Sequence, residues 1–220
     1  MERKTTQVFI RVCLILALVV FPGTAFGYEI ISPTADSFTL KSDANKNFGT
    51  GHTIRVKANN EATARYGWLQ FTLESEPVPY AELWIYQTSG GSGEMKDFRI
   101  RGSAVSFSET GITWNNQPGG TTLNWGTGIL GPVNWAYSGT GWRTIDMTNF
   151  YNANLGNTVS LRLRGEDQTN PHGNTMDFAT KENPDPAIRP YLIIPEPGSF
   201  AVLAFGMASA GGMLIRRRRR

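Results

Sequence analysis

Residues 81–87, AELWIYQ, alternate between two kinds of side chain. Leu83 and Ile85 share one side of an extended chain, and Trp84 and Tyr86 share the other. A period of two residues is typical of a β-strand with one buried face. The stretch therefore predicts a strand that packs its aliphatic residues into a core and turns its two aromatic rings outward.

The same alternation recurs in other short runs, at residues 53–58, 68–73, 98–101 and 159–164. Glycine-rich turn clusters separate the runs, at residues 49–51, 89–93, 118–120 and 165–173. One short helix is expected at residues 148–155, capped by Thr148 and closed by Gly156. Many short strands between turns predict an all-β fold, an antiparallel β-sandwich of jelly-roll type, as a single domain over residues 28–194.

The start of the chain, residues 1–27, differs from this body. Basic residues come first, then an apolar run, then a Pro-Gly break and the small residues Ala25 and Gly27. This layout predicts a secretory signal helix that signal peptidase removes after Gly27.

The end of the chain, residues 195–220, has three adjoining parts. Pro195, Glu196 and Pro197 precede an uncharged apolar stretch at residues 199–215. A helix over that stretch would be about 25 Å long, near the lower limit for crossing a bilayer. Five arginines follow it and are expected to remain cytoplasmic: Arg216, Arg217, Arg218, Arg219 and Arg220. The sequence thus predicts a C-terminal transmembrane helix with the body outside the inner membrane.

This tail resembles the PEP-CTERM sorting signal of Gram-negative bacteria, which joins a Pro-Glu-Pro triplet, an apolar helix and an arginine cluster in that order. The resemblance implies that an exosortase recognises the tail and cleaves near the triplet. The protein would be anchored transiently in the inner membrane and finally reside at the cell surface or outside the cell. A plain C-terminal anchor with an incidental proline-rich stalk is the alternative.

The body resembles the DNRLRE-domain family. The most specific match is VSFSETGITWNNQP at residues 105–118, and further matches are TADSFTLKSDANKNFGTGHTIRVKA at 34–58, ARYGWLQFTLE at 64–74, WRTIDMT at 142–148 and MDFATKENPDPAIRPYLII at 176–194. Phe107 stands where that family usually has a tryptophan. The family is similar to carbohydrate-binding modules, so the resemblance implies a β-sandwich that binds extracellular polysaccharide without catalysis.

Charge and cysteine content exclude some functions. The net charge is +3, but five of the 21 Lys and Arg residues are Arg216–Arg220, and acidic residues outnumber basic ones in the body. The basic balance therefore reflects the ends of the chain, and no nucleic-acid partner is expected. The one cysteine, Cys13, lies in the leading apolar run, so the body uses neither disulfides nor a thiolate nucleophile.

Catalytic patterns are also missing from the sequence. The two histidines, His52 and His172, lie in glycine-rich loops and match neither a nucleophile–base arrangement nor a zinc-ligand spacing. The carboxylates of Glu166, Asp167 and Asp177 could serve glycoside hydrolysis only if the fold placed a pair across a cleft. The sequence therefore predicts a protein that is not an enzyme.

A carbohydrate site is expected on the outward sides of the strands. Trp84 and Tyr86 could stack on pyranose rings. Arginines that alternate with core residues could grip carboxylate or sulfate groups of an acidic polysaccharide, namely Arg99, Arg101, Arg162 and Arg164. Trp114 and Asn116 are expected to be structural instead, as a buried ring and a turn-bonding amide. The rival hypotheses are a structural matrix protein with no sugar site and a glycan-active enzyme.

The one cofactor that the sequence suggests is structural calcium. Oxygen ligands are present at Asp36, Asp43 and Asn45 in the first loop region, and Glu182 could approach them in a sandwich. Asp and Asn also form turns without any metal, so a calcium site and plain turns remain alternatives.

Overall fold

A computed structural model describes residues 27–57, 62–90, 94–122, 124–136, 139–165 and 175–196. It contains eleven strands: β1 (Tyr28–Ile31), β2 (Ala35–Leu40), β3 (Thr53–Lys57), β4 (Arg65–Thr72), β5 (Glu82–Gly90), β6 (Glu94–Ser103), β7 (Thr127–Ala136), β8 (Gly141–Asp146), β9 (Thr158–Gly165), β10 (Thr175–Ala179) and β11 (Tyr191–Pro195). Three short helical turns join them: η1 (Lys41–Asp43), α2 (Thr148–Asn152) and η2 (Pro186–Ile188). The predicted all-β class is confirmed.

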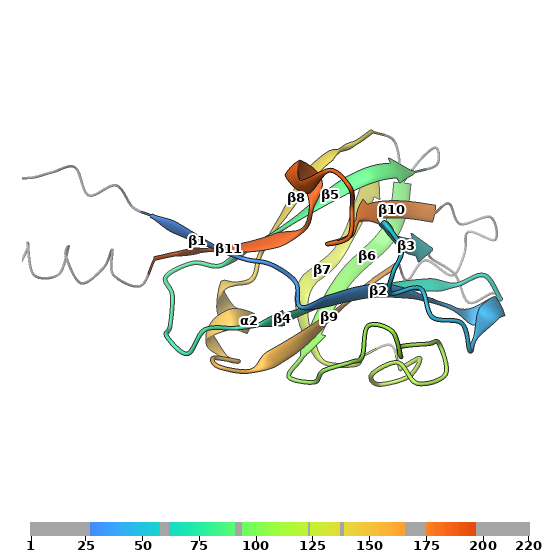
Figure 1. Ribbon diagram of the computed structural model, residues 1–220, viewed down its shortest axis with the longest axis horizontal. Helices are drawn as coiled ribbons and strands as arrows, with labels where there is room; N and C mark the ends of the chain where they lie inside the picture. The colour runs from blue at the N-terminus through green and yellow to red at the C-terminus, as the bar shows by residue number, and fades with distance from the viewer. Residues whose placement is uncertain are drawn as a thin grey trace, which may run out of the picture. The chain divides into compact units, whose positions relative to one another are not determined.

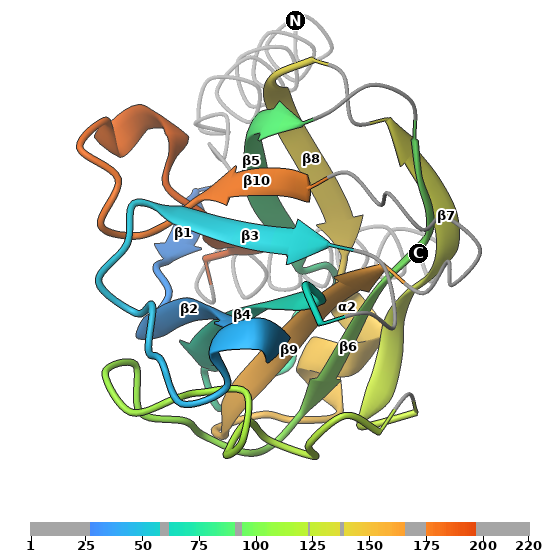
Figure 2. The same ribbon diagram turned by 90° about the vertical axis from the view of Figure 1, so that its right-hand side faces the viewer.

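The strands form one curled antiparallel sheet. Its order is β1-β11-β5-β10-β3-β4-β9-β6-β7, with β2 added to β4 and β8 added to β5. Figures 1 and 2 both show β5 and β8 on one side of the body and β4 and β9 on the other. The two halves face each other across the core as the sheets of a sandwich do, but they are joined by hydrogen bonds into one sheet. The jelly-roll type stays a prediction.

The core fills the space between the two halves. Leu83 and Ile85 of β5 are at most 1% exposed, and they belong to the same apolar cluster as Leu161 and Leu163 of β9. In regular strands such as β5 and β9, every second residue belongs to this cluster, because side chains alternate across a strand. The predicted inward side of residues 81–87 is therefore confirmed.

The other face of β4 and β9 is buried too. A second apolar cluster joins Tyr66 and Trp68 of β4 to Ile112 and Trp114, with Trp125 packed against it. Ile112, Trp114 and Trp125 belong to the long segment between β6 and β7, which we call the cover segment (residues 104–126). The cover segment turns the outer face of this half into a second core.

The turn within the cover segment has the structure expected for its most specific motif. Trp114 is 8% exposed, and its ring lies 4.7 Å from that of Tyr66. The amide oxygen of Asn116 accepts hydrogen bonds from the backbone N–H and the hydroxyl of Thr113, and its amide nitrogen donates to the carbonyl of Gly111. The structural roles predicted for Trp114 and Asn116 are confirmed.

A short helix is present, as α2, but it ends at Asn152, and Thr148 is its first residue and not its cap, which is Met147. Asp146 accepts hydrogen bonds from the backbone N–H and the hydroxyl of Thr148, at 2.8 and 2.6 Å, just before the helix. Gly156, with φ of 69°, follows the helix where the chain turns back toward β9.

Tyr28–Pro195 forms a compact unit, and the ends lie mostly outside the described residues. Ala25, Pro197, the apolar stretch 199–215 and the arginines 216–220 are among the residues that are not described. Within the described part of the chain, no helix has the length and apolarity needed to cross a bilayer. The backbone N–H of Glu196 donates to the carbonyl of Gly27 at 3.0 Å.

Gly67 of β4 provides a test of how closely β3 packs against β4. A methyl group at this position would lie 2.6 Å from Cγ2 of Ile54 and 3.1 Å from Cγ2 of Val56, closer than packed atoms allow. We expect Gly67→Ala to lower the free energy of unfolding by about 1–3 kcal/mol in chemical denaturation.

Gly131 on β7 is the matched control, since nothing lies within 4 Å of the methyl group it would gain. Gly131→Ala should change stability by less than about 0.5 kcal/mol. Equal unfolding midpoints for the two variants would show that β3 and β4 are not packed as described.

Candidate functional site

Four aromatic side chains from three strands meet on the outer side of the β5 half. Trp84 and Tyr86 of β5 lie beside Trp142 of β8 and Tyr191 of β11. We call these four residues the aromatic face. All four are partly exposed, so each ring packs on its neighbours while part of it reaches the surface.

The strand register explains why these rings converge. Tyr191 is paired with Trp84, and Tyr86 with Trp142, so their side chains leave the sheet on the same side. The rings of Trp84 and Tyr191 are stacked, 5.9 Å apart with 12° between their planes. Trp142 meets the other three rings at steeper angles, with centroids 5.2–5.8 Å away.

One carboxylate is bonded to the aromatic face. Glu82 accepts a hydrogen bond from the indole N–H of Trp84 at 2.8 Å, which orients that ring. Burial, with a smaller contribution from the charge of Glu82, raises the pKa of Tyr191, so its hydroxyl remains protonated and able to donate at neutral pH.

The sequence pattern predicted only two members of this face. Trp84 and Tyr86 followed from alternation, and the structure places them side by side on the outer face as expected. Trp142 and Tyr191 were missed because each lies in a short strand far along the chain. Two cues were available in the sequence. Trp142 is the first residue of the motif WRTIDMT, and Tyr191 directly precedes the apolar run Leu192–Ile194.

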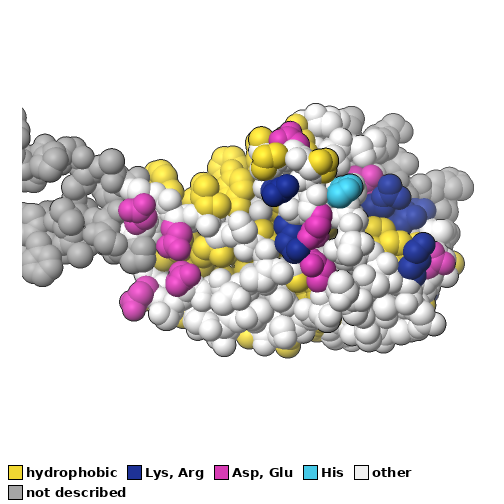
Figure 3. All heavy atoms as spheres, viewed as in Figure 1, with side chains coloured by type: hydrophobic (Ala, Val, Ile, Leu, Met, Phe, Trp, Pro, Cys, Tyr) yellow, Lys and Arg dark blue, Asp and Glu magenta, His cyan; other side chains and the backbone are white. Residues whose placement is uncertain are grey.

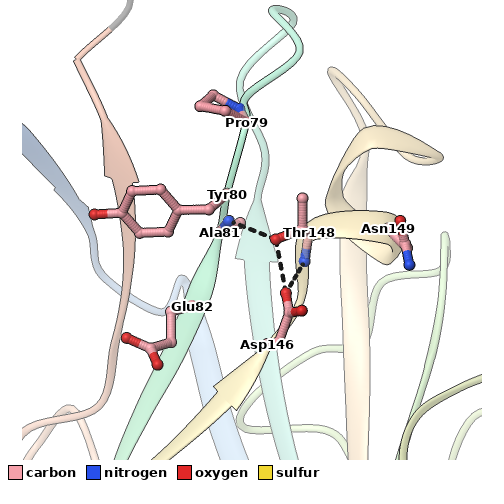
Figure 4. Close-up of a pocket in the computed structure, with 7 residues that line it drawn as sticks. All are labelled: Pro79, Tyr80, Ala81, Glu82, Asp146, Thr148 and Asn149. Atoms are coloured by element: carbon pink, nitrogen blue, oxygen red, sulfur yellow. Dashed lines mark hydrogen bonds between the residues drawn. The ribbon is translucent and has the colours of Figure 1, made fainter.

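A pocket of about 410 Å³ adjoins the aromatic face at Glu82 (Figure 4). Its lining residues come from the segment just before β5 and the first residue of that strand, from the end of β8 and from the first turn of α2; they are Pro79, Tyr80, Ala81, Glu82, Asp146, Thr148 and Asn149. Exposed apolar side chains continue toward β1, where Tyr28 and Ile30 are 57% and 61% exposed and the ring of Tyr28 meets that of Tyr80. Figure 3 shows hydrophobic side chains gathered over β1 and β11 with acidic side chains beside them.

The pocket contains two carboxylates on neighbouring strands, as a glycoside hydrolase would require, but each has a local structural partner. Asp146 accepts two hydrogen bonds from Thr148, and these lower the pKa of its carboxyl group. Glu82 is bonded to Trp84. A general acid needs a raised pKa, so Asp146 lacks the property that acid catalysis demands.

The expectation that Arg162 and Arg164 are exposed is wrong. Both side chains are buried, with 1% and 5% exposure. They do leave β9 on the side opposite the core, but the cover segment lies over Arg162, and Tyr66 of β4 packs against both guanidinium groups. Arg162 donates to the carbonyl of Thr122 at 2.7 Å, and its guanidinium lies over the rings of Tyr66 and Trp125. Arg164 lies over the ring of Tyr66, 4.7 Å from its centroid.

The other two arginines are partly exposed and engaged locally. Arg99 forms a two-point ion pair with Asp97, at 3.0 and 3.1 Å. Arg101 donates to the carbonyls of Trp125 and Gly126, both at 2.8 Å, and so holds the end of the cover segment. These arginines lie on β6, which has no pairing with β5 or β8, so they do not extend the aromatic face.

With this geometry in place, the comparison with known families is decisive. The family model described as carbohydrate-binding module family 96 matches residues 28–196. The chain belongs to this family. No curated protein matches the chain. Membership in a family of carbohydrate-binding modules indicates a carbohydrate-binding, noncatalytic domain, in agreement with what the resemblance of the body implied.

The module also brings together part of the predicted calcium set. Carboxylate oxygens of Asp36, Glu109 and Glu182 all lie within 4.8 Å of one another. Asp36 and Glu182 were expected here, whereas Glu109 was not. Asp43 and Asn45 are not in the group: Asp43 is exposed, and the side-chain oxygen of Asn45 accepts from the amide of Asn115 at 2.7 Å.

Lys181 completes this acidic cluster, which we define as Asp36, Glu109, Lys181 and Glu182. The Lys181 ammonium contacts Glu109 at 3.0 Å and also contacts Glu182. Its backbone N–H donates to Oδ2 of Asp36 at 2.6 Å. Burial raises the pKa of Asp36 to about 8; the bond from Lys181 opposes the rise, and the charges of Glu182 and Glu109 add to it.

Burial of Arg162 gives a testable consequence for the module. Arg162→Ala would leave the carbonyl of Thr122 without its partner and open a cavity between Tyr66 and Trp125. We expect this variant to lower the free energy of unfolding by roughly 2–4 kcal/mol in chemical denaturation.

Arg55→Ala is the matched control, because the Arg55 side chain is 49% exposed and its ion pair with Asp177 is 3.7 Å long. Loss of such an exposed pair costs no more than about 1 kcal/mol. If Arg162→Ala were as mild as Arg55→Ala, the cover segment would not be packed over β9.

Proposed function

We propose that the module binds extracellular polysaccharide through the aromatic face, without catalysis. The observation that carries this proposal is the convergence of Trp84, Tyr86, Trp142 and Tyr191 on one outer surface of a carbohydrate-binding module.

The chemistry of such a face suits a sugar chain. The C–H side of a pyranose ring is apolar and flat, and it gains free energy by packing on an aromatic ring. Ordering a tryptophan side chain on binding costs little conformational entropy, because the side chain has few rotatable bonds. The indole of Trp84 is in addition already oriented by its hydrogen bond to Glu82. The stacked pair of Trp84 and Tyr191, with Trp142 across from it, would contact successive sugar units of one chain.

Polar groups beside the rings would set the orientation of the chain. Glu82 can accept from sugar hydroxyls, and the neutral hydroxyl of Tyr191 can donate to them. The apolar side chains of Tyr28 and Ile30 offer an extension of the surface beyond β11. The ligand would therefore contact aromatic rings and groups that bind hydroxyls. Arg99, Arg101, Arg162 and Arg164 form contacts within the domain instead.

The second part of the proposal concerns the location of the protein. The ends of the sequence support export through the inner membrane of a Gram-negative bacterium, removal of residues 1–27 by signal peptidase, and transient anchoring by residues 199–215 until an exosortase acts near Pro195–Pro197. β1 begins at Tyr28, directly after the proposed cleavage position, so the domain loses no strand when the signal helix is removed.

The triplet itself bears on how the processing enzyme would act. Pro195 is the last residue of β11 and is buried, whereas Glu196 is exposed. An enzyme that grips the tail would thus reach Glu196 at the surface of the described part of the chain.

Affinity gels test the sugar-binding proposal. We expect the full chain to be retarded by at least one member of a panel of neutral and acidic polysaccharides. Trp84→Ala or Trp142→Ala should weaken that retention by roughly ten-fold, because each removes one stacking ring. The melting temperature of each variant, followed by circular dichroism, would establish that the loss is not unfolding.

Arg55→Ala is the matched surface control, since Arg55 is exposed on β3, which β10 separates from β5. Its retention should equal that of the unaltered chain. Retention that depends on Arg55 and not on Trp84 would overturn the aromatic face. An unretarded chain over the whole panel would favour the structural matrix protein.

Replacement of Pro195, Glu196 and Pro197 by alanine tests the location. In the native host, the variant should accumulate uncleaved in the inner membrane, as measured by fractionation and immunoblotting. Processing at the normal rate would show that the triplet is incidental and that the tail is a plain anchor.

A further inference from the structure

We propose that Asp36, Glu109 and Glu182 bind a calcium ion that fastens the cover segment to the sheet. The three residues come from distant parts of the chain. Asp36 lies on β2, Glu109 in the cover segment, and Glu182 in the loop that follows β10. A cation held by all three would crosslink these parts.

The first argument is an unsatisfied carboxylate. Asp36 is 0% exposed, and its Oδ1 atom has no hydrogen-bond partner, although its Oδ2 atom accepts from Lys181. Oε2 of Glu182 is likewise buried without a hydrogen-bond partner. A buried carboxylate oxygen without a donor is costly, and a cation among the three carboxylates would satisfy both atoms.

The second argument is charge. A bound cation would displace the proton that the raised pKa leaves on Asp36 at neutral pH. With all three acids ionised around the cation, the acidic cluster has three negative charges and the one positive charge of Lys181. The charged groups that act on Asp36 are the other three members of the cluster. About two negative charges are thus left over, which is the charge of one divalent cation.

The third argument is geometry and ligand type. All the ligands are carboxylate oxygens, which hard cations prefer. Two oxygens on opposite sides of Ca²⁺ lie about 4.6–5.2 Å apart, whereas around Mg²⁺ they lie about 4.0–4.2 Å apart. Carboxylate oxygens within 4.8 Å of one another lie close enough to share one calcium ion.

The position of Glu109 is built in advance. Oε1 of Glu109 accepts from the backbone N–H of Asp36 at 2.9 Å, and the Glu109 carbonyl accepts from the amide of Asn47 at 2.6 Å. Gly49 lies so close that a methyl group there would overlap the Glu109 carbonyl. The loop before β3 therefore holds Glu109 toward Asp36 independently of the ion.

Lys181 competes with the ion in this arrangement. Its ammonium already contacts Glu109 and Glu182, so calcium must share or displace these contacts. The affinity expected is accordingly that of an extracellular calcium module, with a Kd of about 10⁻⁴–10⁻³ M.

Calcium titration of the full chain, after removal of metals by chelator, tests the site. We expect isothermal titration calorimetry with CaCl₂ to show one ion per chain. The melting temperature should rise by about 5–10 °C at a hundred-fold excess of Ca²⁺ over its Kd. The same excess of MgCl₂ should give a smaller rise.

Variants separate a bound ion from a purely internal charge cluster. Asp36→Asn keeps the shape of the side chain and should abolish the calcium response, and Glu182→Gln, at the more exposed edge, should weaken it at least ten-fold. Lys181→Met should tighten calcium binding, because it removes the competing ammonium. Asp43→Asn is the matched control outside the cluster and should leave the response unchanged.

The opposite results would overturn the proposal. If the unaltered chain shows neither heat of binding nor a shift in melting temperature at 10 mM CaCl₂, Lys181 is the only counterion of the cluster. A calcium response that Asp43→Asn abolishes and Asp36→Asn leaves intact would place the ion in the first loop instead. Neither result affects the aromatic face, which lies on other strands.

Discussion

Burial of the Arg162 guanidinium is the constraint on which the rest of the architecture depends. A charged group that is 1% exposed must be satisfied, and the cover segment does this with the Thr122 carbonyl and the ring of Trp125, while β4 supplies the ring of Tyr66. This arrangement covers the outer face of β4 and β9, where nearly every residue is buried. Figures 1 and 2 show the β5 half on the other side of the core, and its outer face is where the aromatic rings reach the surface.

The two outer faces have therefore taken different roles. On β4 and β9, aromatic rings face buried arginines and contribute to stability. On β5, β8 and β11, aromatic rings face one another and solvent, with Glu82 as the ionisable neighbour bonded to them. Both faces contain tryptophan and tyrosine, so composition alone does not distinguish them. The difference is that the cover segment lies over the rings of one face and leaves the other face open to a ligand. The match to carbohydrate-binding module family 96 is consistent with the open face being the one that meets a ligand.

The acidic cluster is a second point at which the cover segment is attached to the rest of the body. It joins β2, the cover segment and the loop after β10, so it holds the closed side together at a point far along the chain from Arg162. Arg101, which was expected to contact a ligand, holds the other end of the same segment through carbonyl groups. A segment of more than twenty residues without strands is thus fixed at both ends and in its middle, which the apolar contacts of Trp114 alone would not achieve.

Alternation by itself determined five of the described strands (β3, β4, β5, β6 and β9), the inward side of residues 81–87 and the outward positions of Trp84 and Tyr86, because the period of two is a local property of extended backbone. The short helix and the turn around Asn116 were predictable for the same reason, since their hydrogen bonds are local. Only the tertiary structure decided that the side of β9 opposite the core is covered, that Trp142 and Tyr191 join Trp84, and that Glu109 replaces Asp43 and Asn45 beside Asp36. Each of these depends on which distant segments lie side by side, and a residue pattern specifies which side a side chain takes without specifying what packs against that side.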